Sequence, residues 1–462
     1  MSDTPTQLSY FSGLFQSVAE RGRALVRPRK VEPPGVDALI AQCQKLLKGR
    51  GEASGAAIAS IILEGYGALA TAERRAFLAA LAEKYGPDLK GLAEFARAFA
   101  ENPTAEGAAE LSELAEPVRQ ELIRRLNHAP GGTLALVRLR EDLIDAARED
   151  PSLKAFDRDF LHLFSSWFNR GFLTLRRIDW TTPAVVLEKI IRYEAVHAID
   201  DWAELRRRLE PPDRRLYAFF HPALGDEPLI FVEVALTPAI PDAIQPLLAR
   251  ERVPLSPNTA TTAVFYSISN AQRGLAGVSF GNFLIKQVVE DLRREWPKLT
   301  SFVTLSPAPG FAAWLKRERA KEGSGLIDKE AKRALALADH PGWEAKASAR
   351  EAVAKALAPL AAHYFLEARD GQRRALDPVA RFHLGNGARL ERINPLADTS
   401  EKGLAQSLGL MVNYLYDLDH IEANHEAYAN RGEIAAAPAL RKLVAAAAKN
   451  EAARKKTTEK AG

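Results

Sequence analysis

The chain has 462 residues, of which 47% are hydrophobic and 26% are charged, with a formal net charge of +4 at pH 7. This composition is typical of an ordinary globular protein, and the length favours two domains over one. The small net charge gives no support for a nucleic-acid-binding function, and no apolar run approaches the roughly 20 residues of a membrane-spanning helix.

The N-terminal part of the chain predicts a helical domain. Residues 1–35 form a tail that lacks the apolar core and cleavage site of a secretory signal and ends in the linker "RKVEPPG". From 36 to 171, segments such as "AERRAFLAALAEKYG" carry apolar residues at helical spacing, which predicts a packed bundle. Cys43 is the single cysteine, so an intrachain disulfide and a cysteine-rich zinc site are excluded and a cytoplasmic location is expected.

Residues 172–445 predict a second domain that mixes strands and helices. β-branched and aromatic residues gather from 172 onward, and "RLYAFFHP" and "PLIFVEVALTP" predict neighbouring strands. A strand at 261–269, an amphipathic helix at 281–297 and a strand at 299–307 follow in that order. Strand, helix and strand in succession predict a parallel pair with a right-handed connection.

The rest of this domain is expected to be largely helical. The polar segment 316–340 predicts a helical surface insertion, and "EKGLAQSLGLMVNYLY" at 401–416 predicts a helix that contains Tyr416. Residues 446–462 are rich in Ala and Lys and predict a solvated tail.

The segment "RFHLGNGARLERIN" at 381–394 predicts a short strand, a tight turn and a second strand. Period-two alternation would then point His383 away from Phe382 and Leu384. Local sequence alone favours a surface or capping histidine beside a turn over a functional one.

A glycine-rich connection, "NAQRGLAGVSFGN", joins the strand at 261–269 to its helix. Glycines let the backbone approach a ligand, and the helix N-terminus offers unpaired N–H groups, so the loop is a candidate cradle for a pyrophosphate with Arg273 beside it. The loop matches neither the dinucleotide fingerprint nor the P-loop sequence. Glycines at such a position often only permit the turn, and spacing alone leaves both interpretations open.

Several longer motifs carry a more specific signal. The segments "FYSISNAQRGLAGVSFGNFLIKQVV", "LSPAPGFAAWL", "DPVARFHLGNGARLERINPLAD" and "GLMVNYLY" occur in this order, with "YEAVHAIDDWAELRRRL" before them. Together they resemble the malonyl-CoA decarboxylase family. The resemblance implies an α+β multidomain chain, in which a helical oligomerisation domain precedes a GNAT-like catalytic α/β domain with a mixed sheet. It also implies a homotetramer that converts malonyl-CoA to acetyl-CoA and carbon dioxide.

The resemblance also assigns the site. The family's catalytic serine falls on Ser306, its catalytic histidine on His383, and supporting positions on Ser267 and Tyr416. The family's ligand loop falls on Ala276, Gly277, Val278, Ser279, Phe280, Gly281 and Asn282. At Ser279 we associate the animal enzymes with a glutamate, so a carboxylate role does not transfer to this chain.

The reaction sets the chemistry that these residues must perform. Loss of carbon dioxide from malonyl-CoA leaves an enolate, which must be stabilised at the thioester oxygen and protonated at C2. Because the unperturbed pKa of histidine is about 6.5, His383 is the expected proton donor. The resemblance to the family implies that Ser306 is the partner of His383, a proton acceptor that also hydrogen-bonds the substrate carboxylate. We expect no metal, biotin or other cofactor, since coenzyme A arrives as part of the substrate.

Other interpretations remain open from the sequence. The chain could be an acyl-CoA-dependent N-acyltransferase, or a module that binds malonyl-CoA without turning it over. His420 and His425 lie near acidic residues, but a polar helix surface explains that cluster better than a metal site. Local spacing does not decide whether His197 and His221 line a functional site.

Overall fold

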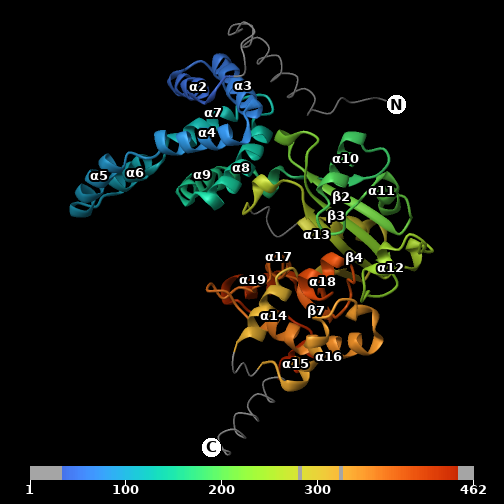
Figure 1. Ribbon diagram of the computed structural model, residues 1–462. Coiled ribbons are helices and arrows are strands. Elements are labelled where there is room, and N and C mark those ends of the chain that lie inside the picture. The colour runs from blue at the N-terminus through green and yellow to red at the C-terminus, as the bar shows by residue number, and fades with distance from the viewer. Residues whose placement is uncertain (1–33, 279–283, 322–325, 446–462) are drawn as a thin grey trace, which may run out of the picture. The chain divides into compact units, whose positions relative to one another are not determined.

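The computed structural model describes residues 34–278, 284–321 and 326–445 (Figure 1). The tail expected at 446–462 and nearly all of the linker and tail expected at 1–35 lie outside these residues. The chain divides into two compact units. The first contains the described residues up to Thr174, the segment Phe220–Leu229 and the loop that begins at Ala271, and the second contains the other described residues.

The first unit is helical, as its apolar spacing predicts. Buried side chains such as Leu39, Phe77 and Phe164 fill its core, and Cys43 is buried among them. Its helices are α2 (Val36–Lys48), α3 (Glu52–Ala68), α4 (Thr71–Lys84), α5 (Leu89–Glu101), α6 (Ala105–Ala115), α7 (Val118–Leu126), α8 (Gly132–Glu149) and α9 (Lys154–Trp167).

The second unit is built on a mixed sheet with the order β1-β2-β3-β4-β5-β8-β6, in which β7 also pairs with β8. β4 and β5 are parallel, whereas β3 pairs with β4, and β8 with β5, β6 and β7, in antiparallel fashion. The strands are β1 (Thr174–Ile178), β2 (Arg214–Phe220), β3 (Pro228–Thr237), β4 (Thr262–Asn270), β5 (Ser301–Thr304), β6 (Ser306–Pro307), β7 (Arg389–Asn394) and β8 (Met411–Leu415).

Helix α13 (Leu284–Glu295) connects β4 to β5, which confirms the predicted parallel strand–helix–strand unit. Val264, Val303 and Leu305 belong to a buried core cluster together with Tyr266 and Met411. Side chains alternate along a strand, so Thr304 and Ser306 face the opposite side of the sheet from Val303 and Leu305. That alternation places Thr304 and Ser306 together, away from this core cluster.

Among the remaining helices of the second unit, α16 packs against β7, and α15 packs against α16 (Figure 1). In the predicted surface insertion at 316–340, Leu335 is fully buried, so this segment also contributes to packing. The helices are α10 (Ala184–Tyr193), α11 (Trp202–Leu209), α12 (Gln245–Leu248), α14 (Phe311–Ala320), α15 (Lys329–Leu337), α16 (Ala347–Leu366), α17 (Pro378–Gly385), α18 (Glu401–Ser407) and α19 (Ile421–Arg431).

The predicted hairpin at 381–394 is wrong in its first half. Residues up to Gly385 form the end of α17, and only β7 is a strand. The helix begins here because the Asp377 side chain caps its first N–H groups and Pro378 occupies its first turn. Phe382 is 37% exposed, whereas Leu384 is buried, so the two do not share a face.

The predicted helix at 401–416 is also wrong in its second half. Helix α18 ends at Ser407, and β8 begins at Met411. Leu408 and Gly409 both have positive φ angles, of 52° and 77°, and two successive left-handed residues terminate a helix. Tyr416 therefore follows a strand rather than lying in a helix.

Candidate active site

Ser306 and His383 lie side by side in the second unit. Ser306 Oγ is 3.0 Å from His383 Nε2, and the two residues are 6% and 2% exposed. β6 supplies the serine just beyond the carboxyl end of β5, and the last turn of α17 supplies the histidine. The structure thus brings together two residues that are 77 positions apart in the sequence.

Two tyrosines contact the imidazole of His383, one at Nδ1 and the other on a face of the ring. Its Nδ1 atom lies 2.8 Å from the hydroxyl of Tyr416, which is 2% exposed. The ring of Tyr414 stacks on it with the centroids 4.7 Å apart and the planes at 26°. Both tyrosines come from β8 or the residue after it, so that strand fixes the orientation of the imidazole.

Burial changes the protonation of this histidine. It lowers the pKa of His383 from 6.5 to about 3, so the imidazole is neutral at neutral pH in the substrate-free protein. Because the side chain is fully enclosed, its pKa lies well below the ordinary histidine value of 6.5 that suggested His383 as a proton donor. Burial also raises the pKa of Tyr416 well above 10, which keeps its hydroxyl protonated.

This lowered pKa predicts a contribution to acid unfolding. Below pH 6.5 the unfolded chain takes up a proton at His383, whereas the folded protein does so only near pH 3. The free energy of unfolding should therefore decrease as the pH falls through this window, by up to about 1.4 kcal/mol per pH unit from this residue. Denaturant unfolding between about pH 7 and pH 5 should show a weaker pH dependence for His383→Gln than for the wild type. Equal pH dependence would contradict the lowered pKa.

Ser267 occupies a different polar cluster. Its hydroxyl donates to both carboxylate oxygens of Glu194, at 2.8 and 2.9 Å, and Ser269 donates to the same carboxylate at 3.0 Å. Among the described residues, no hydrogen bond joins Ser267 to Ser306 or His383. Burial and the nearby Glu233 raise the pKa of Glu194 to about 7. No local pattern singles out Glu194 before the structure is known, because a lone glutamate at a helix end is usually exposed.

The described part of the glycine-rich loop contacts other residues of the first unit. Arg273 forms a bidentate ion pair with Asp145, at 3.0 and 2.8 Å. A Cβ atom at Gly274 would lie 1.9 Å from the carbonyl oxygen of Val137 in α8, so this glycine is required for helix packing.

The backbone of the same loop folds on itself. The N–H groups of Ala276 and Val278 donate to carbonyl groups within the loop, and Gly277 has a φ of +81° that favours glycine. The other predicted ligand-loop residues, Ser279, Phe280, Gly281 and Asn282, lie outside the described residues.

The remaining histidines show no metal site in the part of the chain that the structure describes, where no group of three His, Cys, Asp or Glu side chains is arranged to hold an ion. His420 pairs with Asp417 at 3.0 Å, and His425 bonds the Gly385 carbonyl. In the same described residues, no helix is long and apolar enough to span a membrane.

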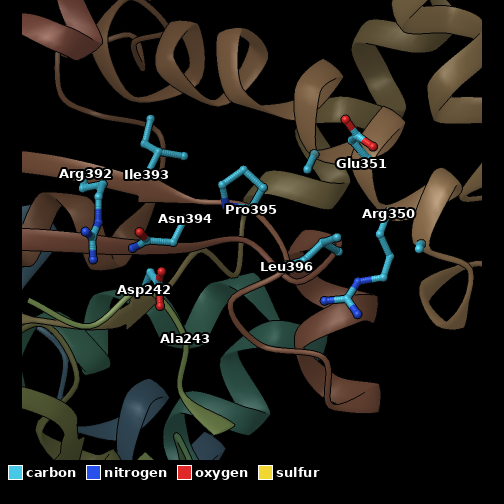
Figure 2. Close-up of a pocket in the computed structure, with 11 residues that line it drawn as sticks. Asp242, Ala243, Arg350, Glu351, Arg392, Ile393, Asn394, Pro395 and Leu396 are labelled. Atoms are coloured by element: carbon cyan, nitrogen blue, oxygen red, sulfur yellow. The ribbon is translucent and has the colours of Figure 1, made fainter. Parts of the chain in front are cut away.

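An open cleft of about 670 Å³ lies elsewhere in the second unit. Figure 2 shows Arg350 and Glu351 on one side of it and Arg392 and Asn394 on the other. The cleft is lined by Asp242, Ala243, Ala347, Arg350, Glu351, Ala354, Arg392, Ile393, Asn394, Pro395 and Leu396. It includes none of the residues that surround the imidazole, so it is separate from the Ser306–His383 pair.

Comparison with known proteins agrees with the order of the motifs. The family profile described as malonyl-CoA decarboxylase C-terminal domain matches residues 171–454, and the N-terminal domain profile matches 85–168. The chain is 37% identical over 397 residues to the mitochondrial malonyl-CoA decarboxylase of Anser anser anser, covering 79% of this chain and 78% of that protein. It is 36% identical over 414 residues to the mitochondrial enzyme of Mus musculus, covering 82% and 84%.

Solved structures agree with this result. The crystal structure of malonyl-CoA decarboxylase from Rhodopseudomonas palustris superposes with a TM-score of 0.86 at 60% identity, covering 88% of this chain and 100% of that one. The enzyme from Agrobacterium vitis gives a TM-score of 0.82 at 55% identity, covering 88% and 99%. The chain therefore belongs to the malonyl-CoA decarboxylase family.

Proposed function

We propose that this protein converts malonyl-CoA to acetyl-CoA and carbon dioxide. Membership of the family supports this substrate and this reaction. The 3.0 Å contact between Ser306 Oγ and His383 Nε2 is the observation that supports the location of the active site. The two buried side chains form a hydroxyl–imidazole pair of the kind that general acid–base catalysis uses.

The chemistry needs one proton and a stabilised anion. The bond between C2 and the carboxylate carbon breaks, carbon dioxide leaves, and the electron pair is delocalised as an enolate onto the thioester oxygen. A proton then adds to C2, so the overall reaction consumes one proton from the solvent. No step in this sequence oxidises or reduces the substrate.

His383 supplies that proton from Nε2. The imidazole is neutral in the substrate-free protein, so the proton that it transfers to C2 is the one bound at Nε2, and a proton from the solvent then replaces it. Tyr416 stabilises the imidazole at Nδ1 and stays protonated itself, because burial holds the pKa of its hydroxyl well above 10.

Ser306 acts as the acceptor for the Nε2 proton of His383. Its own proton points to Thr304 Oγ1 at 2.9 Å, which leaves a lone pair of Ser306 Oγ for the imidazole. A hydrogen bond from Ser306 to the substrate carboxylate would require this proton to turn away from Thr304.

We also propose that the protein acts in the cytoplasm, as a homotetramer, without a metal or biotin and without a nucleic-acid partner. The single thiol, Cys43, fits a reducing compartment. The animal relatives, by contrast, are named as mitochondrial. The tetramer rests on the family resemblance.

Incubation with malonyl-CoA alone tests this function against its alternatives. A decarboxylase forms acetyl-CoA and carbon dioxide without an acceptor, which mass spectrometry and a carbon dioxide assay detect. An N-acyltransferase would release free coenzyme A only when an amine is added, and a binding module would retain malonyl-CoA unchanged. Absence of acetyl-CoA across a range of pH values would refute the proposal.

A further inference from the structure

Thr304 is a second hydroxyl residue beside the Ser306–His383 pair. It is the last residue of β5, its exposed fraction is 0%, and it lies two positions before Ser306 on the same side of the sheet. Its Oγ1 atom accepts a hydrogen bond from Ser306 Oγ at 2.9 Å and another from the backbone N–H of Tyr414 at 3.2 Å. The hydroxyl oxygen of Thr304 is thus the acceptor of the hydrogen bond that Ser306 donates.

This contact determines where the proton of the imidazole sits. A serine hydroxyl has a single proton to donate, and here it points to Thr304. The 3.0 Å contact between Ser306 Oγ and His383 Nε2 must then be made by an N–H group on Nε2. Nδ1 is left as the acceptor, and it receives the hydroxyl proton of Tyr416 at 2.8 Å.

The four side chains therefore form one directional series of hydrogen bonds. Tyr416 donates to His383, His383 donates to Ser306, and Ser306 donates to Thr304. Reversing the series would place the imidazole proton on Nδ1 and leave Nε2 without one. Only the direction that ends at Thr304 leaves a proton on the nitrogen that faces Ser306.

We propose that Thr304 is a positioning residue for decarboxylation, which accepts the Ser306 proton and thereby keeps His383 in its Nε2–H form. This role rests on the proposed function, because it matters for turnover only if His383 protonates the enolate. Thr304 touches no reacting atom in this scheme and acts through Ser306 and His383. An imidazole held in the wrong tautomer cannot deliver a proton from the required nitrogen.

Substitution of Thr304 separates this role from simple packing. Valine has a similar shape but no oxygen, so in Thr304→Val the Ser306 proton turns to Nε2 and the imidazole proton moves to Nδ1. Serine keeps the acceptor, so Thr304→Ser should retain the wild-type arrangement. Thr262→Val is a matched control, because Thr262 is a 2% exposed threonine on β4 that takes no part in this series.

The test is ¹⁵N NMR of histidine-labelled, substrate-free protein, with His383→Gln used to identify the His383 signals. We expect Nε2–H in the wild type, Thr304→Ser and Thr262→Val, and Nδ1–H in Thr304→Val. In turnover, Thr304→Val should lower kcat by roughly 100-fold with little change in KM, whereas Thr304→Ser stays close to the wild type.

An Nδ1–H imidazole in the wild-type protein would overturn the proposal, and this measurement does not depend on whether any variant folds. An unchanged tautomer in folded Thr304→Val would overturn it as well. Because the tautomer is read without substrate, its failure is distinct from failure of the decarboxylase assay. A tautomer switch in a protein that makes no acetyl-CoA would refute only the proposed function.

Discussion

Replacement of His383 by glutamine should lower kcat for malonyl-CoA by roughly 10²- to 10⁴-fold, the range that general acid–base catalysis contributes. Glutamine places an amide N–H near the former Nε2 position, so the hydrogen bond to Ser306 can persist. An amide cannot transfer that proton to C2 at neutral pH, and the enolate then lacks its donor. Steady-state kinetics and equilibrium binding of malonyl-CoA should show a large loss of turnover with little loss of affinity.

His221→Gln is the matched control for this substitution. His221 is 8% exposed, and its hydrogen bonds within the described residues of the first unit join it to backbone groups, the Trp167 carbonyl and the Ala223 N–H. Its replacement removes a buried imidazole without touching the pair. Similar losses of turnover in His221→Gln and His383→Gln would point to general destabilisation instead of proton transfer.

Replacement of Ser306 by alanine should lower kcat by roughly 100-fold, the scale measured when one preorganised hydrogen-bonding group is removed from an active site. The change leaves Nε2 of His383 and Oγ1 of Thr304 without the hydroxyl that joins them. The imidazole then loses the contact that sets its proton on Nε2. Kinetics at saturating malonyl-CoA measure this effect.

Ser407→Ala provides the comparison for the serine. Ser407 is 2% exposed, and its hydroxyl bonds two backbone carbonyls, those of Gly403 and Leu410. Both substitutions remove one buried hydroxyl, so their effects on the free energy of unfolding should be of the same order, about 1 kcal/mol. If Ser306→Ala retained wild-type turnover, the serine would have no role in the reaction.

The architecture was largely predictable because its strongest signals are local. Apolar runs gave β2 and β3, and the order of strand, amphipathic helix and strand gave the parallel pair of β4 and β5. The errors occurred where short apolar runs suit either helix or strand. At α17 the decisive signal was Asp377 followed by Pro378, a cap and a first-turn proline that favour a helix start.

The site was less predictable, because it depends on contacts between distant segments. The motifs pointed to Ser306, His383 and Tyr416 only through a family resemblance, and no local spacing shows that three different elements place them together. Alternation along 299–307 does put Thr304 beside Ser306, so that neighbour was within reach of sequence reasoning. The lowered pKa of His383 was not within reach of sequence reasoning, since it depends on complete enclosure of the side chain by the fold.

The most direct test of the account is single-turnover reaction of malonyl-CoA in D₂O with the wild type and with His383→Gln. For the wild type we expect one equivalent of carbon dioxide and acetyl-CoA that carries one deuterium in its methyl group, since the proton added at C2 comes from an exchangeable site. For His383→Gln, acetyl-CoA should form roughly 10²- to 10⁴-fold more slowly at the same occupancy of the site. Equal rates for the two proteins, or no acetyl-CoA from the wild type, would contradict it.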